Sequence, residues 1–185
     1  MKKNFGAQTW LYPMPVLIIA TYDEKGAPNA MNAAWGGIAD TGLIGICLSD
    51  DHKTTQNILK RKAFTVSVAD AVHVTEADYV GLVSGNREPD KLKKAGFTAT
   101  KSAFVDAPVI DQLPMALECE YVKTTEFGQV IGKIVNVCAD ESVLGESGKI
   151  DPSKFRPITF DPVNDKYIAL GAAVGNAFAD GAKLK

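Results

Sequence analysis

The chain has 185 residues, of which 46% are hydrophobic and 23% charged, and its formal net charge is −2. This length suits one domain, and the composition is that of a folded globular protein, because enough apolar surface is available to offset the loss of chain entropy. The balanced charge excludes the basic footprint of a nucleic-acid-binding protein, and no segment approaches the roughly 18 apolar residues of a membrane span. We therefore expect a cytoplasmic protein without nucleic-acid or membrane partners.

The first part of the chain predicts three β-strands. Residues 15–22 are rich in β-branched side chains and end at Asp23–Gly26, a turn sequence typical of hairpins. The chain returns through residues 29–35, and a third apolar run, residues 43–48, follows the turn at residues 40–42. Strands joined by such short turns predict an antiparallel meander.

The middle of the chain mixes helices and one strand. A polar stretch with several possible N-caps predicts a short helix that begins near Thr54 and ends with basic residues at Lys62. Residues 63–69 alternate between apolar and polar side chains and predict a strand. Residues 72–96 predict a helical insertion, in which Gly96 follows the last turn and requires a positive φ.

Strands return in the last part of the chain. We expect them at residues 113–121, 130–137, 157–160 and 167–170. Many short strands with helices between them predict a closed or partly closed β-barrel of a single domain, residues 1–185. A Rossmann fold is excluded, because regular βαβ alternation and a Gly-x-Gly-x-x-Gly motif after a strand are both missing.

Cysteines and histidines give no support for a metal site. Cys47, Cys119 and Cys138 are far apart, each in a predicted strand, and we expect them to be buried free thiols. His52 and His73 are the only histidines. Since no spacing singles out a catalytic set either, we assign no catalytic residue, and we expect a bound cofactor to carry any reaction.

A series of short motifs runs in order from about residue 9 to residue 172. They are Tyr12-Pro-Met-Pro, Asp23-Glu-Lys-Gly-Ala-Pro-Asn29, Ala33-Ala-Trp-Gly-Gly37, Ser84-Gly with Asp90-Lys91 and Ala95-Gly-Phe97, the run Pro108–Glu118, Ile131-Gly-Lys-Ile-Val135, and Arg156-Pro-Ile158. Each motif is short, but their order and spacing together resemble the flavin reductase-like, FMN-binding split-barrel family, and the flavoredoxins in particular.

The resemblance implies a mainly β fold, a six-stranded antiparallel Greek-key split β-barrel, with FMN near the interface of a homodimer. It also implies an oxidoreductase that transfers electrons or hydride through the flavin, with NAD(P)H or a redox protein as partner. Two alternatives stay open. In the first alternative the protein is a non-catalytic FMN-binding module. In the second it is a structural barrel whose flavin site has changed or decayed.

The resemblance further implies which residues contact the cofactor. Small side chains in the second strand would let its backbone approach the flavin ring, and polar groups would bind the ring edge and the phosphate. The implied cofactor-binding residues are Asn29, Asn32, Ala33, Ala34, Trp35, Ser49, Lys53, Thr54, Thr55, Ser84, Gly85, Lys91 and Phe160.

Thr54 matches the family's phosphate-contacting threonine. A nearly dianionic phosphate is stabilised by the N–H groups and hydroxyls at a helix start, and an ordinary N-cap is the alternative role for this residue. The neighbouring Asp50 and Asp51 would oppose a phosphate unless they point away, and His52 and Lys53 would offset them.

The other implied contacts also have structural alternatives. Asn29 would hydrogen-bond to the polar edge of the ring, or it would be an ordinary turn residue. Trp35 would shield the ring or lie in the core. Lys91 would stabilise the reduced flavin or the phosphate, or be a solvated helix lysine. Phe160 would cover the ring or be a core residue. Phe127 stands where the family often has a histidine, so one flavin contact becomes apolar or is lost.

Overall fold

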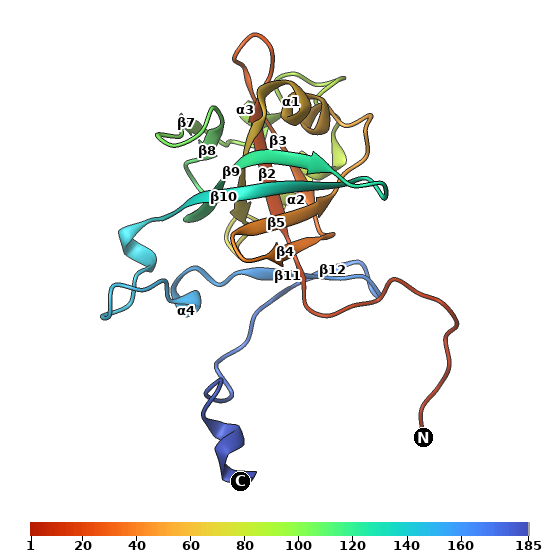
Figure 1. Cartoon of the computed structure of the whole chain (residues 1–185), viewed down its shortest axis with the longest axis vertical. Helices are drawn as coiled ribbons and strands as arrows, with labels where there is room; N and C mark the ends of the chain where they lie inside the picture. The colour runs from red at the N-terminus through yellow and green to blue at the C-terminus, as the bar shows by residue number, and fades with distance from the viewer. Residues whose placement is uncertain (185) are drawn as a thin grey trace.

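The computed structural model describes residues 1–184 and is dominated by one strongly curled antiparallel sheet (Figure 1). The sheet has the strand order β3-β2-β6-β9-β10-β5-β4. Its strands are β2 (Leu17–Tyr22), β3 (Pro28–Ala33), β4 (Gly36–Asp40), β5 (Leu43–Cys47), β6 (Ala63–Val68), β9 (Met115–Thr124) and β10 (Gln129–Ala139). The predicted mainly β split barrel is confirmed.

The sheet curls so strongly that a short link joins its two edge strands. Strands β3 and β4 stand at opposite ends of the strand order, yet only Ala34 and Trp35 separate them in the chain. The prediction of a meander is wrong here, because β5 pairs with β4 and β10 and not with β3. The return segment predicted at residues 29–35 is the shorter strand β3, and β4 is a further strand, which brings the main sheet to seven strands instead of six.

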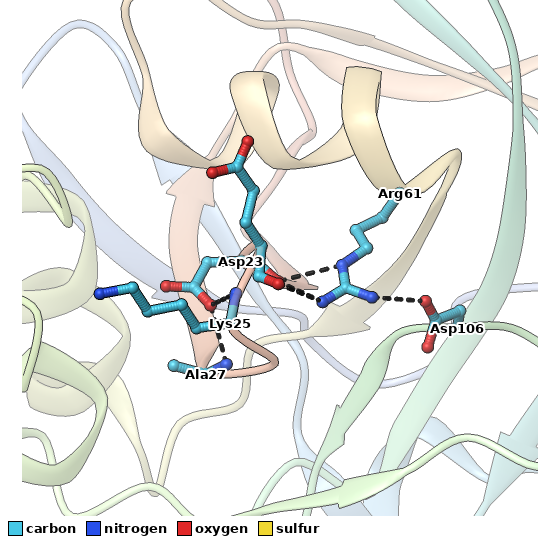
Figure 2. Close-up of polar contacts among 6 residues, drawn as sticks. Asp23, Lys25, Ala27, Arg61 and Asp106 are labelled. Carbon is cyan, nitrogen blue, oxygen red and sulfur yellow. Dashed lines mark hydrogen bonds and ion pairs between the residues drawn. The ribbon is translucent and has the colours of Figure 1, made fainter.

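The predicted hairpin turn joins β2 and β3 and is held by the Asp23 carboxylate and by Arg61 (Figure 2). The Asp23 carboxylate accepts the N–H groups of Lys25 and Ala27, each at 2.9 Å. The Arg61 guanidinium, at the end of the first helix, donates to the Asp23 carbonyl and to the Asp106 carboxylate. The turn thereby sets the register of β3, which carries three of the predicted site residues, Asn29, Asn32 and Ala33.

Strand β2 is buried on both faces. Since side chains alternate along a strand, Leu17 and Ile19 face the interior of the curled sheet, while Ile18 and Ala20 face the opposite side. The interior cluster draws on most strands of the sheet and contains Phe64, which is fully buried. The opposite cluster lies beneath the helices of the insertion and determines where those helices sit.

Helices cover part of the outer face and the top of the sheet. The longer ones are α1 (Lys53–Arg61) and α2 (Val74–Leu82), and the short helix α3 (Lys91–Lys94) follows. Helices are thus found within the predicted insertion, and Gly96 has the expected positive φ of 75°. The remaining short helices are η1 (Glu141–Val143), α4 (Pro152–Phe155) and η2 (Asp180–Leu184).

Two small sheets complete the described fold. Strands β1 (Met14–Pro15), β11 (Ile158–Asp161) and β12 (Lys166–Ala169) form a three-stranded sheet below the main sheet in Figure 1. Strands β7 (Ala99–Lys101) and β8 (Pro108–Ile110) form a hairpin that the sequence pattern did not predict. Within residues 1–184, no helix combines the length and apolar character required to cross a membrane.

Both ends of the chain run out from the body on the same side (Figure 1). Residues 1–13 and 171–184 are exposed throughout. They carry large apolar side chains, among which Leu11 is 68% and Phe178 is 111% exposed. These apolar side chains therefore lie outside the core.

The three cysteines lie in strands, as predicted, but only one is buried. Cys119 is buried in β9, and burial raises the pKa of its thiol to about 12. Cys138 is half-buried in β10. The expectation of a buried thiol is wrong for Cys47, because the side chain at the end of β5 points to the surface.

Candidate functional site

A cleft of about 400 Å³ lies between the start of α1, strand β3, and the end of α2 with the loop that follows it. Six of the predicted site residues line this cleft, although they come from four separate segments of the chain. They are Asn32, Lys53, Thr54, Ser84, Gly85 and Lys91.

The start of α1 presents free backbone donors. His52 is the N-cap residue, and its side chain makes no capping hydrogen bond. The first helical hydrogen bond runs from the Gln56 N–H to the His52 carbonyl at 3.1 Å, so the N–H groups of Lys53, Thr54 and Thr55 precede it. This end of the helix therefore favours an anion. Thr54 lies inside the helix, and the alternative role of an N-cap is wrong.

The hydroxyl of Thr54 is held by strand β3. The side-chain amide nitrogen of Asn29 donates to the Thr54 hydroxyl oxygen at 2.8 Å, and both side chains are buried. This bond uses a lone pair of the oxygen and leaves the hydroxyl hydrogen free to donate. Asn29 itself does not line the cleft, so the structure places it behind Thr54 as a support.

Gly85 closes the wall of the cleft against Asn29. A Cβ atom at this position would lie 2.2 Å from Asn29 Oδ1 and 3.3 Å from Lys53 Cβ. Only a glycine lets the loop after α2 approach the start of α1 this closely. The side-chain amide of Asn86 also donates to the Asp51 carbonyl at 3.0 Å, which ties the same loop to the turn before α1.

Cations outnumber carboxylates around the cleft. Lys53, Arg87 and Lys91 line it together with a single carboxylate, Asp51. Asp50, which the sequence placed among possible opponents of a phosphate, does not line it. This balance and the open helix start together make the cleft suitable for an anionic group.

Lys91 lines the cleft, and two hydrogen bonds fix the position of its ammonium group. Its side chain is 3% exposed, and its ammonium group donates to the carbonyls of Val80 and Val83, each at 2.9 Å. Burial lowers the pKa of Lys91 to about 8. The alternative of a solvated lysine is therefore wrong, since Lys91 satisfies carbonyls at the end of α2.

Two of the predicted residues lie beside the cleft rather than in it. The Thr55 hydroxyl donates to the Ser49 carbonyl at 2.8 Å, which fixes the loop before α1. Neither Thr55 nor Ser49 lines the cleft.

The apolar predicted residues are placed elsewhere. Ala34 and Trp35 line a second cleft of about 400 Å³, whose other wall is the N-terminal segment with Trp10 and Leu11. Trp35 is 55% exposed, so the alternative of a core tryptophan is wrong. Ala33 pairs with Leu17 at the end of β3 and lines neither cleft.

Phe160 and Phe127 also lie outside both clefts. Phe160 is half-buried in β11 and packs against the core cluster beneath the helices. Phe127 is 88% exposed in the turn between β9 and β10. It lines a separate surface cleft of about 620 Å³ with Cys47 and Gln129.

Three residues of this region were missed by sequence reasoning. Arg87 lies just after the Ser84-Gly85 motif and lines the cleft. Asp78 and Tyr167 stand behind it, where the Tyr167 hydroxyl donates to the Asp78 carboxylate at 2.7 Å. The motif was a signal for Arg87, whereas no local pattern pairs Asp78 with a residue so distant in the chain.

Comparison with known proteins supplies independent information. Residues 9–161 match the family described as the flavin reductase like domain. The structure is similar to that of flavoredoxin from Desulfovibrio vulgaris (Miyazaki F), with 39% identity, a TM-score of 0.94, and coverage of 98% of this chain and 100% of that one. It is also similar to flavoredoxin from Methanosarcina acetivorans, with 26% identity, a TM-score of 0.89 and complete coverage of both chains.

More distant matches come from both structure and sequence. An FMN-binding domain of a flavin reductase-like enzyme from Shewanella baltica has 20% identity and a TM-score of 0.78, over 88% of each chain. The uncharacterised protein YdfE of Bacillus subtilis is 23% identical over 197 residues, which cover 95% of this chain and 93% of YdfE.

Proposed function

Because the chain belongs to the flavin reductase-like family, we propose that it binds FMN and works as an oxidoreductase of the flavin reductase or flavoredoxin type. Electrons or hydride would pass through the bound flavin, with NAD(P)H or a redox protein as the partner. The description of one similar structure as an FMN-binding domain supports FMN as the cofactor.

The observation that carries this proposal is the Thr54 hydroxyl, oriented by Asn29 at the open start of α1. FMN carries a phosphate that is close to dianionic, and such a group is stabilised by helix N–H groups, hydroxyl donors and nearby cations. Thr54, Lys53 and Arg87 would hold it, and the close approach of Gly85 leaves backbone rather than side chain at the wall.

The flavin would supply the redox chemistry, and this chain would bind it, orient it and exclude water. A cleft of about 400 Å³ is in the size range of cofactor pockets. Asn32 and Lys91 line the same cleft and would contact the cofactor beyond the phosphate. Contacts from Trp35 and Phe160 stay predictions, since neither residue lines this cleft.

We also propose that the working unit is a homodimer. The exposed terminal segments carry Leu11, Val174 and Phe178, and the second cleft sets Trp35 beside the N-terminal segment. Covering these apolar surfaces with a second copy would be favourable. The family resemblance implies a cofactor near such an interface. A cytoplasmic location stays a prediction.

The cofactor and the activity are tested in turn. The visible spectrum of the purified protein, followed by titration with FMN, tests binding, and a protein that neither contains nor takes up FMN would contradict the proposal. Consumption of NADH and NADPH with FMN present then tests catalysis. A protein that binds FMN, but consumes neither nucleotide and accepts no electrons from a redox protein, is a non-catalytic flavin-binding module.

A further inference from the structure

Asn32 occupies a junction between the cleft and helix α2. Its side chain is half-buried and lines the cleft from strand β3. Its amide nitrogen donates to the Ala77 carbonyl at 3.0 Å. Helix α2 lies directly against it, because a Cβ atom at Gly81 would be 2.9 Å from Asn32 Cβ.

These contacts determine which end of the Asn32 amide is available. A carbonyl oxygen only accepts hydrogen bonds, so the nitrogen of the amide must face Ala77. The Tyr167 hydroxyl lies nearby: burial raises the pKa of this tyrosine, and the Asn32 side chain opposes that rise. With its nitrogen engaged on the helix side, Asn32 offers Oδ1 as an acceptor.

Tyr167 and Asp78 hold this arrangement from behind. Tyr167 comes from β12 of the small sheet, and its hydroxyl donates to the Asp78 carboxylate of α2 at 2.7 Å. Burial and the nearby Asp78 raise the pKa of Tyr167 to about 12, so its hydroxyl keeps its proton at neutral pH. The pair therefore fixes helix α2 to the small sheet at the residue next to Ala77, whose carbonyl accepts the Asn32 amide.

We propose that Tyr167 and Asp78 are positioning residues that orient the Asn32 carboxamide, so that its Oδ1 accepts a hydrogen bond from an N–H or O–H group of the flavin. The inference rests on the proposed function, because it requires FMN in the cleft. It adds a specific role for two residues that lie outside the cleft and that no motif of the sequence singles out.

The proposal is tested by a double-mutant cycle on FMN binding. The dissociation constant is measured by quenching of flavin fluorescence, and the visible spectrum of the bound flavin is recorded. Tyr167→Phe keeps the ring and removes the hydroxyl, so it should weaken binding about tenfold or less and shift the visible band. In an Asn32→Ala background, the same change should have no further effect, because its target is gone.

Matched variants separate positioning from a general loss of structure. Tyr121→Phe also removes one tyrosine hydrogen bond, that to Thr124 in β9, and should bind FMN as the wild type does. Asp78→Asn keeps an acceptor for the Tyr167 hydroxyl and should retain binding and spectrum, whereas Asp78→Leu should behave like Tyr167→Phe.

Several results would overturn the inference. Wild-type affinity and spectrum in Tyr167→Phe would do so, and so would full additivity of the Tyr167 and Asn32 changes. If Tyr167→Phe fails to fold, the Asp78→Asn and Asp78→Leu comparison decides, and equal binding by these two variants would reject the role. Absence of FMN binding by the wild type would instead contradict the proposed function itself.

Discussion

The Asn29 side-chain amide nitrogen lies 2.8 Å from the hydroxyl oxygen of Thr54, so a residue of strand β3 orients a donor at the start of helix α1. Asn29 follows the β2–β3 turn, and Thr54 follows the loop after β5. The curl of the sheet is what brings the two segments together. The cleft therefore depends on long-range topology as much as on its own residues.

Replacement of Thr54 by alanine tests the phosphate contact. The variant should lose about 1.5–3 kcal/mol of FMN binding, the range for a hydrogen bond to a charged group. Riboflavin lacks the phosphate, so its affinity should be unchanged. Fluorescence titration with both ligands makes the comparison within one protein, and equal weakening of the two would reject this role for Thr54.

Replacement of Gly85 by alanine tests the close approach at the cleft wall. The added Cβ would meet Asn29 Oδ1 at 2.2 Å and must displace the amide from Thr54. We expect a loss of about 1–3 kcal/mol in the free energy of unfolding, measured by urea denaturation, together with weaker FMN binding.

Gly37→Ala is the matched control for Gly85→Ala. A Cβ at Gly37 would have nothing within 4 Å, and its backbone does not require a glycine. It should change the free energy of unfolding by no more than about 0.5 kcal/mol. If Gly85→Ala were as mild as this control, the wall would not be closely packed.

Replacement of Lys91 by methionine tests the buried ammonium. The pKa of Lys91 is lowered to about 8 by burial, from 10.5, so between these pH values the unfolded chain binds more protons than the folded one. The wild type should therefore gain stability relative to Lys91→Met as the pH rises from 8 to 10.5. Urea denaturation of both proteins across this range gives the difference. A difference that does not change with pH would contradict the assigned burial.

Replacement of Ser102 by alanine tests how the loop before β8 is anchored. The Ser102 hydroxyl donates to the buried Glu118 carboxylate at 2.5 Å and accepts the N–H groups of Phe104 and Val105 at 2.9 Å. The variant should lose about 1–3 kcal/mol of stability, because buried polar groups lose their partner. Ser147→Ala changes an exposed serine and should be nearly neutral. Thermal denaturation of the wild type and both variants measures these changes in stability. Equal stability of the two variants would show that this anchor is unimportant.

Much of the fold follows from local patterns. The β-branched run of β2, the Asp23–Gly26 turn and the alternation in β6 are all strong local signals, and the structure contains each of them. The wrong meander has a physical cause. Which strand pairs with which depends on side-chain burial across the whole sheet. The two-residue link of Ala34 and Trp35 contains no sequence signal that the chain passes to the other edge of the sheet.

The site was predictable only in part, for the same reason. The family resemblance implied Lys53, Thr54 and Gly85 as site residues, and all three line one cleft because the implied fold is present. Buried Lys91 depends on the carbonyls of Val80 and Val83, and the proposed support of Asn32 depends on a tyrosine of β12 that bonds to Asp78. Such partners are determined by tertiary packing, and the spacing of residues along the sequence does not reveal them.

The most direct test of the account compares the affinities of the wild-type protein for FMN and for riboflavin under identical conditions. If the start of α1 holds the phosphate, FMN should bind at least about tenfold more tightly, since a charge-assisted hydrogen bond contributes at least about 1.5 kcal/mol. Equal affinities, or no binding of either flavin, would contradict the assignment of this cleft as the cofactor site.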